Sequence, residues 1–224
     1  GITVKGGKYL EAVADADTIV FDKTGTLTKA QPKVVDVVSF DGREPDELLR
    51  IAACLEEHFP HSMAKAVVKS AIEKNLQHDE MHTKVEYLVA HGISTTINDV
   101  RVIIGSYHFI FEDEKCIIPE GKEALFESLP PEYSQLYLAI DGKLAAVICI
   151  EDPVRQEAQA VVNSLRKAGL SKIVMMTGDS ERTASAIAKK VGVDEYYSEV
   201  LPEDKASFVE AEKAKGRKVI MIGD

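Results

Sequence analysis

The stretch "TIVFDKTGTLTKAQP", residues 18–32, decides the fold class. It opens with an apolar run that reads as a buried strand, and this strand ends on Asp22. A carboxylate is costly to bury inside a sheet, so Asp22 belongs at the strand's exposed carboxyl end. In open α/β sheets ligands bind at that end of the strands. We therefore expect Asp22 to lie at the ligand-binding edge of a parallel sheet.

Two later stretches have the same form, an apolar run that ends on a small or acidic residue: "KIVMMTGD" (172–179) and "KVIMIGD" (218–224). Helical patterns accompany them at about 153–168, 181–191 and 203–215, with Pro or Ser near their starts and Gly after their ends. Strands that alternate with helices of this length predict an α/β fold with a doubly wound parallel sheet.

The middle of the chain has a different pattern. After one short strand, helices are expected at about 46–57 and 62–74, followed by several short strands. Residues 136–150 then form a hairpin with Asp141-Gly142 at its turn, a strong short-range hairpin signal. Antiparallel strands beside helices predict an α+β domain.

This α+β pattern interrupts the parallel one, so we expect one domain inserted into a discontinuous second domain. The predicted bounds are 1–32 and 149–224 for the parallel domain and 33–148 for the inserted domain. Gln31-Pro32 and Asp152-Pro153 provide stiff dipeptides near the two crossings. Because the sequence stops at the mouth of a predicted central strand, we also expect a fragment of a longer protein.

The composition excludes several classes of protein. The 224 residues carry a formal net charge of −10, which argues against nucleic acid or anionic lipid as the main partner. No apolar run approaches the roughly 18 residues that indicate a membrane span. The three cysteines are widely spaced, which argues against a disulfide framework and favours a reducing setting. We expect a monomer in which Cys54 and Cys149 are small core residues.

The predicted strand ends bring polar side chains together. In one parallel sheet, Asp22, Thr177, Asp179 and Asp224 converge on a single edge. Such carboxylates repel each other unless a cation lies between them, and oxygen-only ligation suits Mg²⁺, which commonly bridges to phosphate. Lys205, near a predicted helix start, can reach a phosphate on that edge. Asp22 then either binds metal only or is itself a nucleophile.

At this point the residues match a known family. The motif "DKTGTLT" (22–28) resembles the phosphorylation motif of P-type ATPases, within the haloacid dehalogenase superfamily. The motifs "DPVR" (152–155), "TGD" (177–179) and the final "IGD" resemble that family's other motifs in the same order. The resemblance covers nearly the whole chain. It implies a haloacid dehalogenase-like phosphorylation domain with an inserted α+β nucleotide-binding domain.

The resemblance also assigns roles to residues at or near strand ends. The catalytic residues that it implies are Asp22, Thr24, Thr177, Asp179 and Lys205. Asp22 would attack the γ-phosphate of ATP and become an aspartyl phosphate. Mg²⁺ would be bound by Asp22, by the backbone carbonyl of Thr24 and by Asp224. Thr177 and Lys205 would hold phosphoryl oxygens, while Asp179 orients neighbouring groups.

Thr24 also discriminates between functions. Soluble phosphatases of this superfamily carry a second Asp two residues after the nucleophile, as a general acid and base, and Thr24 occupies that position here. Without that base the acyl phosphate should live longer, as a pump requires. A soluble phosphohydrolase of the same superfamily and a nucleotide-binding module without catalysis are the alternatives.

The stretch "ACLEEHFPHSMAKAVV" (53–68) resembles the helix pair of heavy-metal-transporting P-type ATPases. In that branch a glutamate precedes a nucleotide-binding histidine by five residues, as Glu56 precedes His61. The branch's Glu-His-Pro, Gly-x-Gly and Gly-Asn read here as Pro60-His61-Ser62, Ala90-His91-Gly92 and Gly105-Ser106. The ATP contacts that the resemblance implies are Glu56, His61, Gly92 and Gly105.

The same resemblance implies partners and a location. ATP is the expected substrate and Mg²⁺ the expected cofactor. The transported metal cation would be bound by membrane helices outside this chain, and the membrane and actuator domains of the same polypeptide would be its neighbours. The chain would then act at the cytoplasmic face of a membrane. Which cation is transported cannot be read from these residues, because its ligands lie in those helices.

Overall fold

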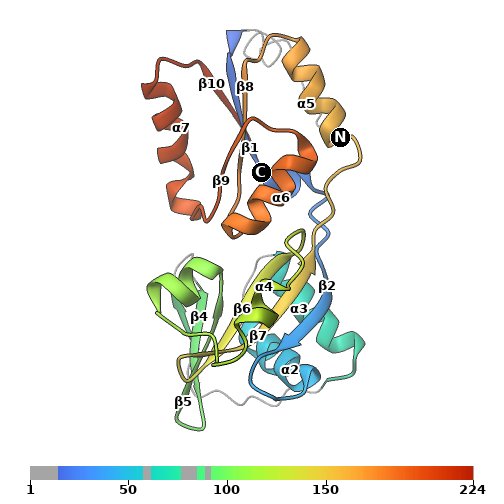
Figure 1. Ribbon diagram of the computed structural model, residues 1–224, viewed down its shortest axis with the longest axis vertical. Coiled ribbons are helices and arrows are strands. Elements are labelled where there is room, and N and C mark those ends of the chain that lie inside the picture. The colour runs from blue at the N-terminus through green and yellow to red at the C-terminus, as the bar shows by residue number, and fades with distance from the viewer. Residues whose placement is uncertain (1–14, 58–61, 77–84, 89–91, 224) are drawn as a thin grey trace. The chain divides into compact units, whose positions relative to one another are not determined.

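The computed structural model describes residues 15–57, 62–76, 85–88 and 92–223 (Figure 1). Its contacts divide the chain into two compact units. We call residues 1–31 with 152–224 the parallel-sheet unit, and residues 32–151 the inserted unit. The α/β fold class expected from the sequence is confirmed, with a parallel sheet in one unit and an antiparallel sheet in the other.

The parallel-sheet unit is built on a four-stranded sheet in the order β10-β1-β8-β9, in which every pairing is parallel. Its strands are β1 (Thr18–Asp22), β8 (Lys172–Met176), β9 (Glu195–Tyr197) and β10 (Val219–Ile222). The register places Asp22 opposite Met176, so β1 and β8 end at the same level. The predicted convergence of their carboxyl ends is therefore present.

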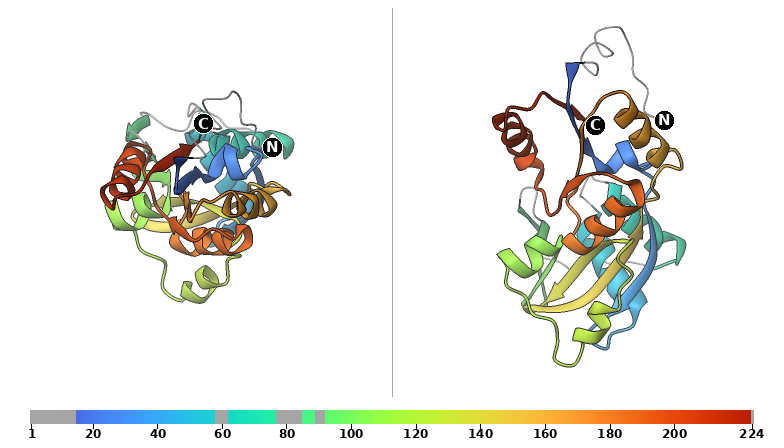
Figure 2. Two further views of the ribbon diagram at one scale, coloured as in Figure 1. Left: turned by 90° about the horizontal axis from the view of Figure 1, so that it is seen from above. Right: turned by 45° about the horizontal axis from the view of Figure 1, so that its top comes forward.

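Helices cover both faces of this sheet because its strands are apolar on both faces. They are α5 (Ala158–Lys167), α6 (Glu181–Val191) and α7 (Lys205–Ala214). Successive strand residues point to opposite faces. Ile19 and Phe21 pack in a cluster with α5 and α6, whereas Val20 packs in a second cluster with Phe208 of α7. Seen from above, α7 lies on one side of the strands and α5 with α6 on the other (Figure 2).

Two helix boundaries differ from the sequence prediction. The predicted start of α5 at Pro153 is wrong, since the helix begins at Ala158. Residues 153–155 instead pair with the loop after β1, where Thr28 forms a bridge with Val154. The predicted helix at 203–215 divides into a short turn η3 (Pro202–Asp204) and α7. By contrast, α6 has the predicted bounds, with the Ser180 hydroxyl accepting a hydrogen bond from the Thr183 N–H as its cap.

The inserted unit contains a six-stranded antiparallel sheet in the order β2-β7-β6-β5-β4-β3. Its strands are β2 (Lys33–Ser39), β3 (Val85–Leu88), β4 (Gly92–Ile97), β5 (Val100–Gly105), β6 (Ser134–Ile140) and β7 (Lys143–Glu151). The β6–β7 pair is the hairpin predicted from Asp141-Gly142. The helices α2 (Pro45–Glu56) and α3 (Ser62–Glu73) contribute Leu48, Leu49 and Val67 to one core cluster with this sheet.

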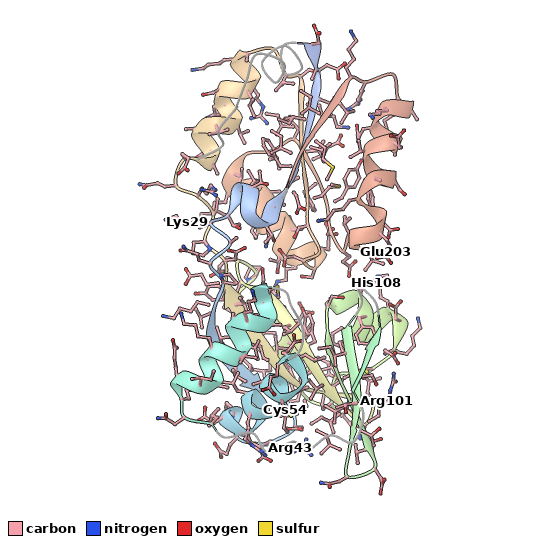
Figure 3. The ribbon with its side chains drawn as sticks, turned by 180° about the vertical axis from the view of Figure 1, so that it is seen from behind. Lys29, Arg43, Cys54, Arg101, His108 and Glu203 are labelled. Carbon is pink, nitrogen blue, oxygen red and sulfur yellow. The ribbon has the colours of Figure 1, made fainter. Side chains whose placement is uncertain are left out.

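A second cluster of the inserted unit is rich in aromatic residues. Residues of the irregular turn η2 (His108–Asp113) and of the short helix α4 (Glu123–Glu127) pack there against β5, β6 and β7. Tyr137 of β6 is fully buried and lies 5.4 Å from Phe111 and 5.9 Å from Tyr107, ring centre to ring centre. Cys149 belongs to this cluster and Cys54 is buried on α2, so the prediction that both are core residues is confirmed (Figure 3).

Within the described residues, no helix has both the length and the apolar character required to cross a bilayer.

We predict that Gly92→Ala destabilises the inserted unit. A Cβ at this position would lie 2.5 Å from both the Ile104 carbonyl oxygen and the Phe109 ring, so the strand or the ring would have to move. Such overpacking costs roughly 1–3 kcal/mol, measurable as a lower free energy of unfolding in urea. Thr96→Ala, at an exposed position of the same strand, is the control and should cost less than about 0.5 kcal/mol. Equal values for the two variants would contradict the prediction.

Candidate active site

Asp22 lies at the carboxyl end of β1, with a side chain that is 14% exposed. The Lys205 ammonium, on the first residue of α7, donates a hydrogen bond to Asp22 Oδ2. At the end of β10, a Cβ on Gly223 would lie 3.2 Å from the Cβ of Asp22. Two segments far apart in sequence therefore meet at this carboxylate. Asp224, the predicted metal ligand that follows Gly223, lies outside the described residues.

Asp179 and Thr177 follow β8, the neighbour of β1. Asp179 Oδ2 accepts hydrogen bonds from the Lys23 ammonium at 2.6 Å and from the Thr177 hydroxyl at 2.8 Å. The Thr177 hydroxyl accepts a third bond from the Asp179 N–H at 3.1 Å. The Lys23 and Asp179 side chains are only 3% and 9% exposed, so this is a nearly buried ion pair. The structure thus brings Asp22, Thr177, Asp179 and Lys205 to one edge of the sheet.

Lys23 was not among the predicted site residues. The sequence does indicate that Lys23 needs an ion-pair partner, because a lysine directly after a buried strand must be paired with an opposite charge if it is buried itself. What the sequence did not give was the identity of that partner. Asp179 follows a different strand, and only the parallel pairing of β1 with β8 brings the two side chains together.

The loop after β1 is an irregular helical turn, η1 (Lys23–Leu27). Thr24 has an extended backbone and Gly25 a left-handed one, with φ of 81°. Glycine adopts that conformation at little cost, so Gly25 lets the chain turn sharply after Asp22. The buried Thr28 hydroxyl closes the turn: it accepts from the Gly25 N–H at 3.1 Å and donates to Asp152 Oδ2 at 2.8 Å.

The motif at 152–155 holds this loop from the other side. The Arg155 guanidinium donates to the carbonyls of Thr26 at 3.1 Å and Gly25 at 3.4 Å, and the Arg155 N–H donates to the Leu27 carbonyl at 2.8 Å. The N–H of Lys29, labelled in Figure 3, donates to the Pro153 carbonyl at 3.3 Å. The sequence motif alone predicts no role for these residues. Its contacts show that it fixes the backbone next to Asp22.

The oxygen donors at this edge fit the predicted cation. Carboxylate and backbone carbonyl oxygens are the ligands that Mg²⁺ prefers, usually with several waters and a phosphate completing its octahedron. Asp22 provides a carboxylate, and the extended backbone of the exposed Thr24 leaves a carbonyl oxygen of the kind that such sites use. Within the described residues, no cysteine or histidine touches Asp22 in a hydrogen bond or ion pair, so this donor set consists of oxygen atoms.

The predicted ATP contacts lie in the inserted unit. Glu56, the last residue of α2, is 3% exposed, and its Oε2 is buried with no hydrogen-bond partner among the described residues. Burial raises the pKa of this carboxyl to about 8. Gly92, the first residue of β4, pairs directly with Gly105, the last residue of β5. His61 lies outside the described residues.

A surface hollow of about 470 Å³ adjoins Glu56. Lys65, Val68 and Lys69 of α3 are among its lining residues. Glu57 and Glu73 also line the hollow, so its charges are mixed. A buried carboxyl oxygen without a partner among the described residues is uncommon, since most buried polar groups are hydrogen-bonded.

Comparisons with known proteins agree with this geometry. A family model for haloacid dehalogenase-like hydrolases matches residues 16–224, and the chain belongs to that family. The chain is 37% identical over its full length to the probable copper-exporting P-type ATPase V of Mycobacterium tuberculosis, and 36% identical to the zinc-exporting P-type ATPase of Mycobacterium marinum. It spans only 29% and 31% of the length of these relatives.

Solved structures give the same result. The catalytic domain of the CPx-ATPase CopB-B is similar with a TM-score of 0.72 at 28% identity, over 99% of this chain and 76% of that one. A zinc-transporting PIB-type ATPase is similar with a TM-score of 0.56 at 30% identity, over 99% of this chain and 35% of that one. The resemblance to heavy-metal P-type ATPases that the motifs indicated is confirmed.

We predict that Thr28→Val loosens the loop beside Asp22. Valine has nearly the same volume but no hydroxyl, so the Gly25 N–H and one Asp152 oxygen lose their partner. The free energy of unfolding should fall by roughly 1–3 kcal/mol, and amide hydrogen exchange at Gly25 should accelerate. Ser171→Ala, which removes an exposed hydroxyl bonded to the Asp17 carbonyl, is the control. Unchanged exchange at Gly25 in Thr28→Val would show that the hydroxyl does not hold the turn.

Proposed function

We propose that the chain is the ATP-binding and autophosphorylating region of a heavy-metal-transporting P-type ATPase. In this proposal residues 1–32 and 149–224 form the phosphorylation domain, and residues 33–148 form the nucleotide-binding domain. The observation that carries the proposal is Asp22 at the carboxyl edge of the sheet, paired with Lys205 and adjacent to the strand that leads to Thr177 and Asp179. The family match and the P-type ATPase relatives support it.

The mechanism follows from the charges at this edge. An Asp22 oxygen attacks the γ-phosphorus of ATP, forming a new P–O bond while the bond to the bridging oxygen breaks and ADP leaves. Lys205 holds Asp22 before transfer, and in this proposal it holds a phosphoryl oxygen afterwards, together with the Thr177 hydroxyl. Asp179 keeps Lys23 and Thr177 in position through its two hydrogen bonds. Mg²⁺, held by Asp22, the Thr24 carbonyl and Asp224, would neutralise the charge that gathers in the transition state.

The inserted unit supplies the proposed nucleotide site. The unpartnered Glu56 oxygen can accept a hydrogen bond from an amino group such as that of adenine. Gly92 and Gly105 pair directly with each other at neighbouring ends of β4 and β5, and both are the ATP contacts that the family resemblance implies. His61 completes the predicted set.

Thr24 favours a pump over the phosphohydrolase alternative. Its side chain is exposed and carries a hydroxyl, which is far too weakly basic to activate water as a second carboxylate would. We infer that the aspartyl phosphate persists long enough to drive a conformational step. In the parent protein, that step would move a metal cation through membrane helices outside this chain, with this region at the cytoplasmic face. The chain's share of its relatives' length leaves room for these parts.

We predict that Asp22→Asn abolishes phosphorylation. The amide cannot act as the nucleophile, so incubation with γ-labelled ATP and Mg²⁺ should leave no acid-stable, hydroxylamine-sensitive label. The experiment should use both this chain and the full-length protein. Asp99→Asn, a matched carboxyl-to-amide change in an exposed turn of the inserted unit, should label normally. Label that persists in Asp22→Asn would disprove the assigned nucleophile, and label in neither wild-type protein would favour a binding module without catalysis.

Glu56 gives a pH-dependent prediction. Because burial raises its pKa from 4.5 to about 8, its contribution to stability is complete below about pH 4.5 and is lost as the pH rises to about 8. Glu56→Gln should therefore raise the free energy of unfolding at pH 9, by a few kcal/mol at roughly 1.4 kcal/mol per pKa unit, and change it little at pH 4.5. Glu120→Gln, at an exposed site, is the control. The same difference at both pH values would contradict a raised pKa.

A further inference from the structure

A second ionic cluster lies inside the parallel-sheet unit, away from Asp22 in sequence. Its centre is Glu212 of α7, whose side chain is completely buried. Glu212 Oε1 accepts from the Tyr197 hydroxyl at 2.6 Å, and both carboxylate oxygens accept from the Lys172 ammonium, at 3.2 Å and 3.0 Å. Arg217 adds a bond at 3.3 Å. A fully buried carboxylate thus connects α7 with the first residue of β8 and the last residue of β9.

The negative charge of the buried Glu212 carboxylate is balanced by the Lys172 ammonium. Burial is the largest influence on Glu212 and acts to raise its pKa, yet the hydrogen bonds from Tyr197 and Lys172 together lower it. The same contact and burial raise the pKa of Tyr197 to about 12, so the phenol remains a donor at neutral pH. Lys172 is also paired with Glu195 at 2.8 Å. Removing Glu212 alone would leave Lys172 buried without its main partner, which is costly.

The cluster connects to the proposed active site by two routes. The first is α7 itself, since Lys205 lies two turns before Glu212, on the same side of the helix. Phe208, between them, packs against the Tyr197 ring with a centre-to-centre distance of 4.6 Å. Anchoring Glu212 to β8 and β9 therefore fixes the rotation and position of the helix that presents Lys205 to Asp22.

The second route runs through the backbone of Tyr197. Its carbonyl accepts a hydrogen bond from the Thr177 N–H at 3.0 Å, and the Val200 N–H donates to the Thr177 carbonyl at 3.0 Å. The Glu199 N–H, two residues after Tyr197, donates to the Asp179 carbonyl at 2.8 Å. The segment that begins at Tyr197 thus holds the backbone of the turn that carries Thr177 and Asp179. Glu212 accepts a hydrogen bond from the side chain of the same tyrosine.

We propose that Glu212 is a positioning residue for phosphoryl transfer, which aligns Lys205 through α7 and Thr177 through Tyr197. The role in phosphoryl transfer rests on the proposed function. The claim that Glu212 fixes the positions of Lys205 and Thr177 does not. If Glu212 holds both groups, its loss must loosen the Thr177 backbone and alter the Lys205–Asp22 pair whether or not the chain is phosphorylated. It should slow the transfer step and leave ATP affinity unchanged, because the proposed ATP contacts lie in the inserted unit.

The test uses Glu212→Gln and Tyr197→Phe in this chain and in the full-length protein. In Glu212→Gln, amide exchange at Thr177 should accelerate by about 10-fold or more, and the NMR signal of the Lys205 amine should shift. The phosphorylation rate at saturating ATP should fall by about 10-fold or more, with the half-saturating ATP concentration unchanged. Tyr197→Phe, which keeps the ring and removes one hydrogen bond, should show smaller changes in the same direction.

A double variant separates positioning from stability. Lys172→Met with Glu212→Leu replaces the buried ion pair with apolar side chains, a change that often preserves stability. Its Tyr197 hydroxyl still lacks its acceptor, so fast exchange at Thr177 and slow transfer should persist in a stably folded protein. If wild-type exchange at Thr177 and a wild-type transfer rate return together with stability, Glu212 has a purely structural role and the inference is overturned.

The matched control is Asp194→Asn. Asp194 also binds an arginine, Arg166, at 2.7 Å and accepts from a β8 backbone N–H, that of Ile173, at 2.8 Å, but it has no bond to α7. It should leave the Thr177 exchange and the transfer rate within about twofold of the wild type. If no protein labels with ATP, the proposed function fails, and the exchange and Lys205 measurements still decide whether Glu212 holds these groups.

Discussion

Asp22 ends β1, and Asp179 follows the adjacent parallel strand β8. The repulsion between carboxylates at one sheet edge is the constraint on which the rest of the parallel-sheet unit depends. The protein meets it with one lysine for each carboxylate. Lys205 binds Asp22 and Lys23 binds Asp179, each from a distant part of the chain. These pairs place a positive charge beside each carboxylate at the edge of an otherwise apolar sheet. The Lys205 ammonium thus positions the proposed nucleophile, and it can bind an incoming phosphoryl group in turn.

The loop after β1 and the helix α7 fix the positions of the charged groups at this edge. Thr28, Asp152 and Arg155 hold the backbone after Asp22, so the carboxylate cannot swing away from the sheet. The helix α7 carries Lys205 to within hydrogen-bond reach of Asp22, and Phe208 packs the same helix against the sheet. The bonds of Glu212 to Lys172 and Tyr197 add a directional contact, because hydrogen bonds to a buried carboxylate fix orientation as well as distance.

The sequence correctly predicts the elements that are specified by residues close together along the chain. The apolar runs at β1 and β8, the capped helix α6 and the Asp141-Gly142 hairpin are each specified within a few residues of chain. It failed where distant segments decide the outcome. The proline at 153 resembled a helix start, but the loop after β1 pairs with residues 153–155 and delays the helix. Likewise, Glu212 and Lys172 look like ordinary surface charges until the register of α7 against β8 buries them together. The contacts of Lys23 and Arg155 depend on strand pairing in the same way.

The interruption of the parallel-sheet unit has a consequence for biosynthesis. Within its sheet, β1 leaves the ribosome before its neighbours β8 and β10, which follow it by about 150 and 200 residues. The inserted unit is contiguous and can fold as soon as β7 has been made, while the apolar strand that carries Asp22 waits with both edges unpaired. Unpaired apolar strands are the segments most exposed to aggregation. During translation, β1 is therefore the strand of this sheet that waits longest for its hydrogen-bonding partners.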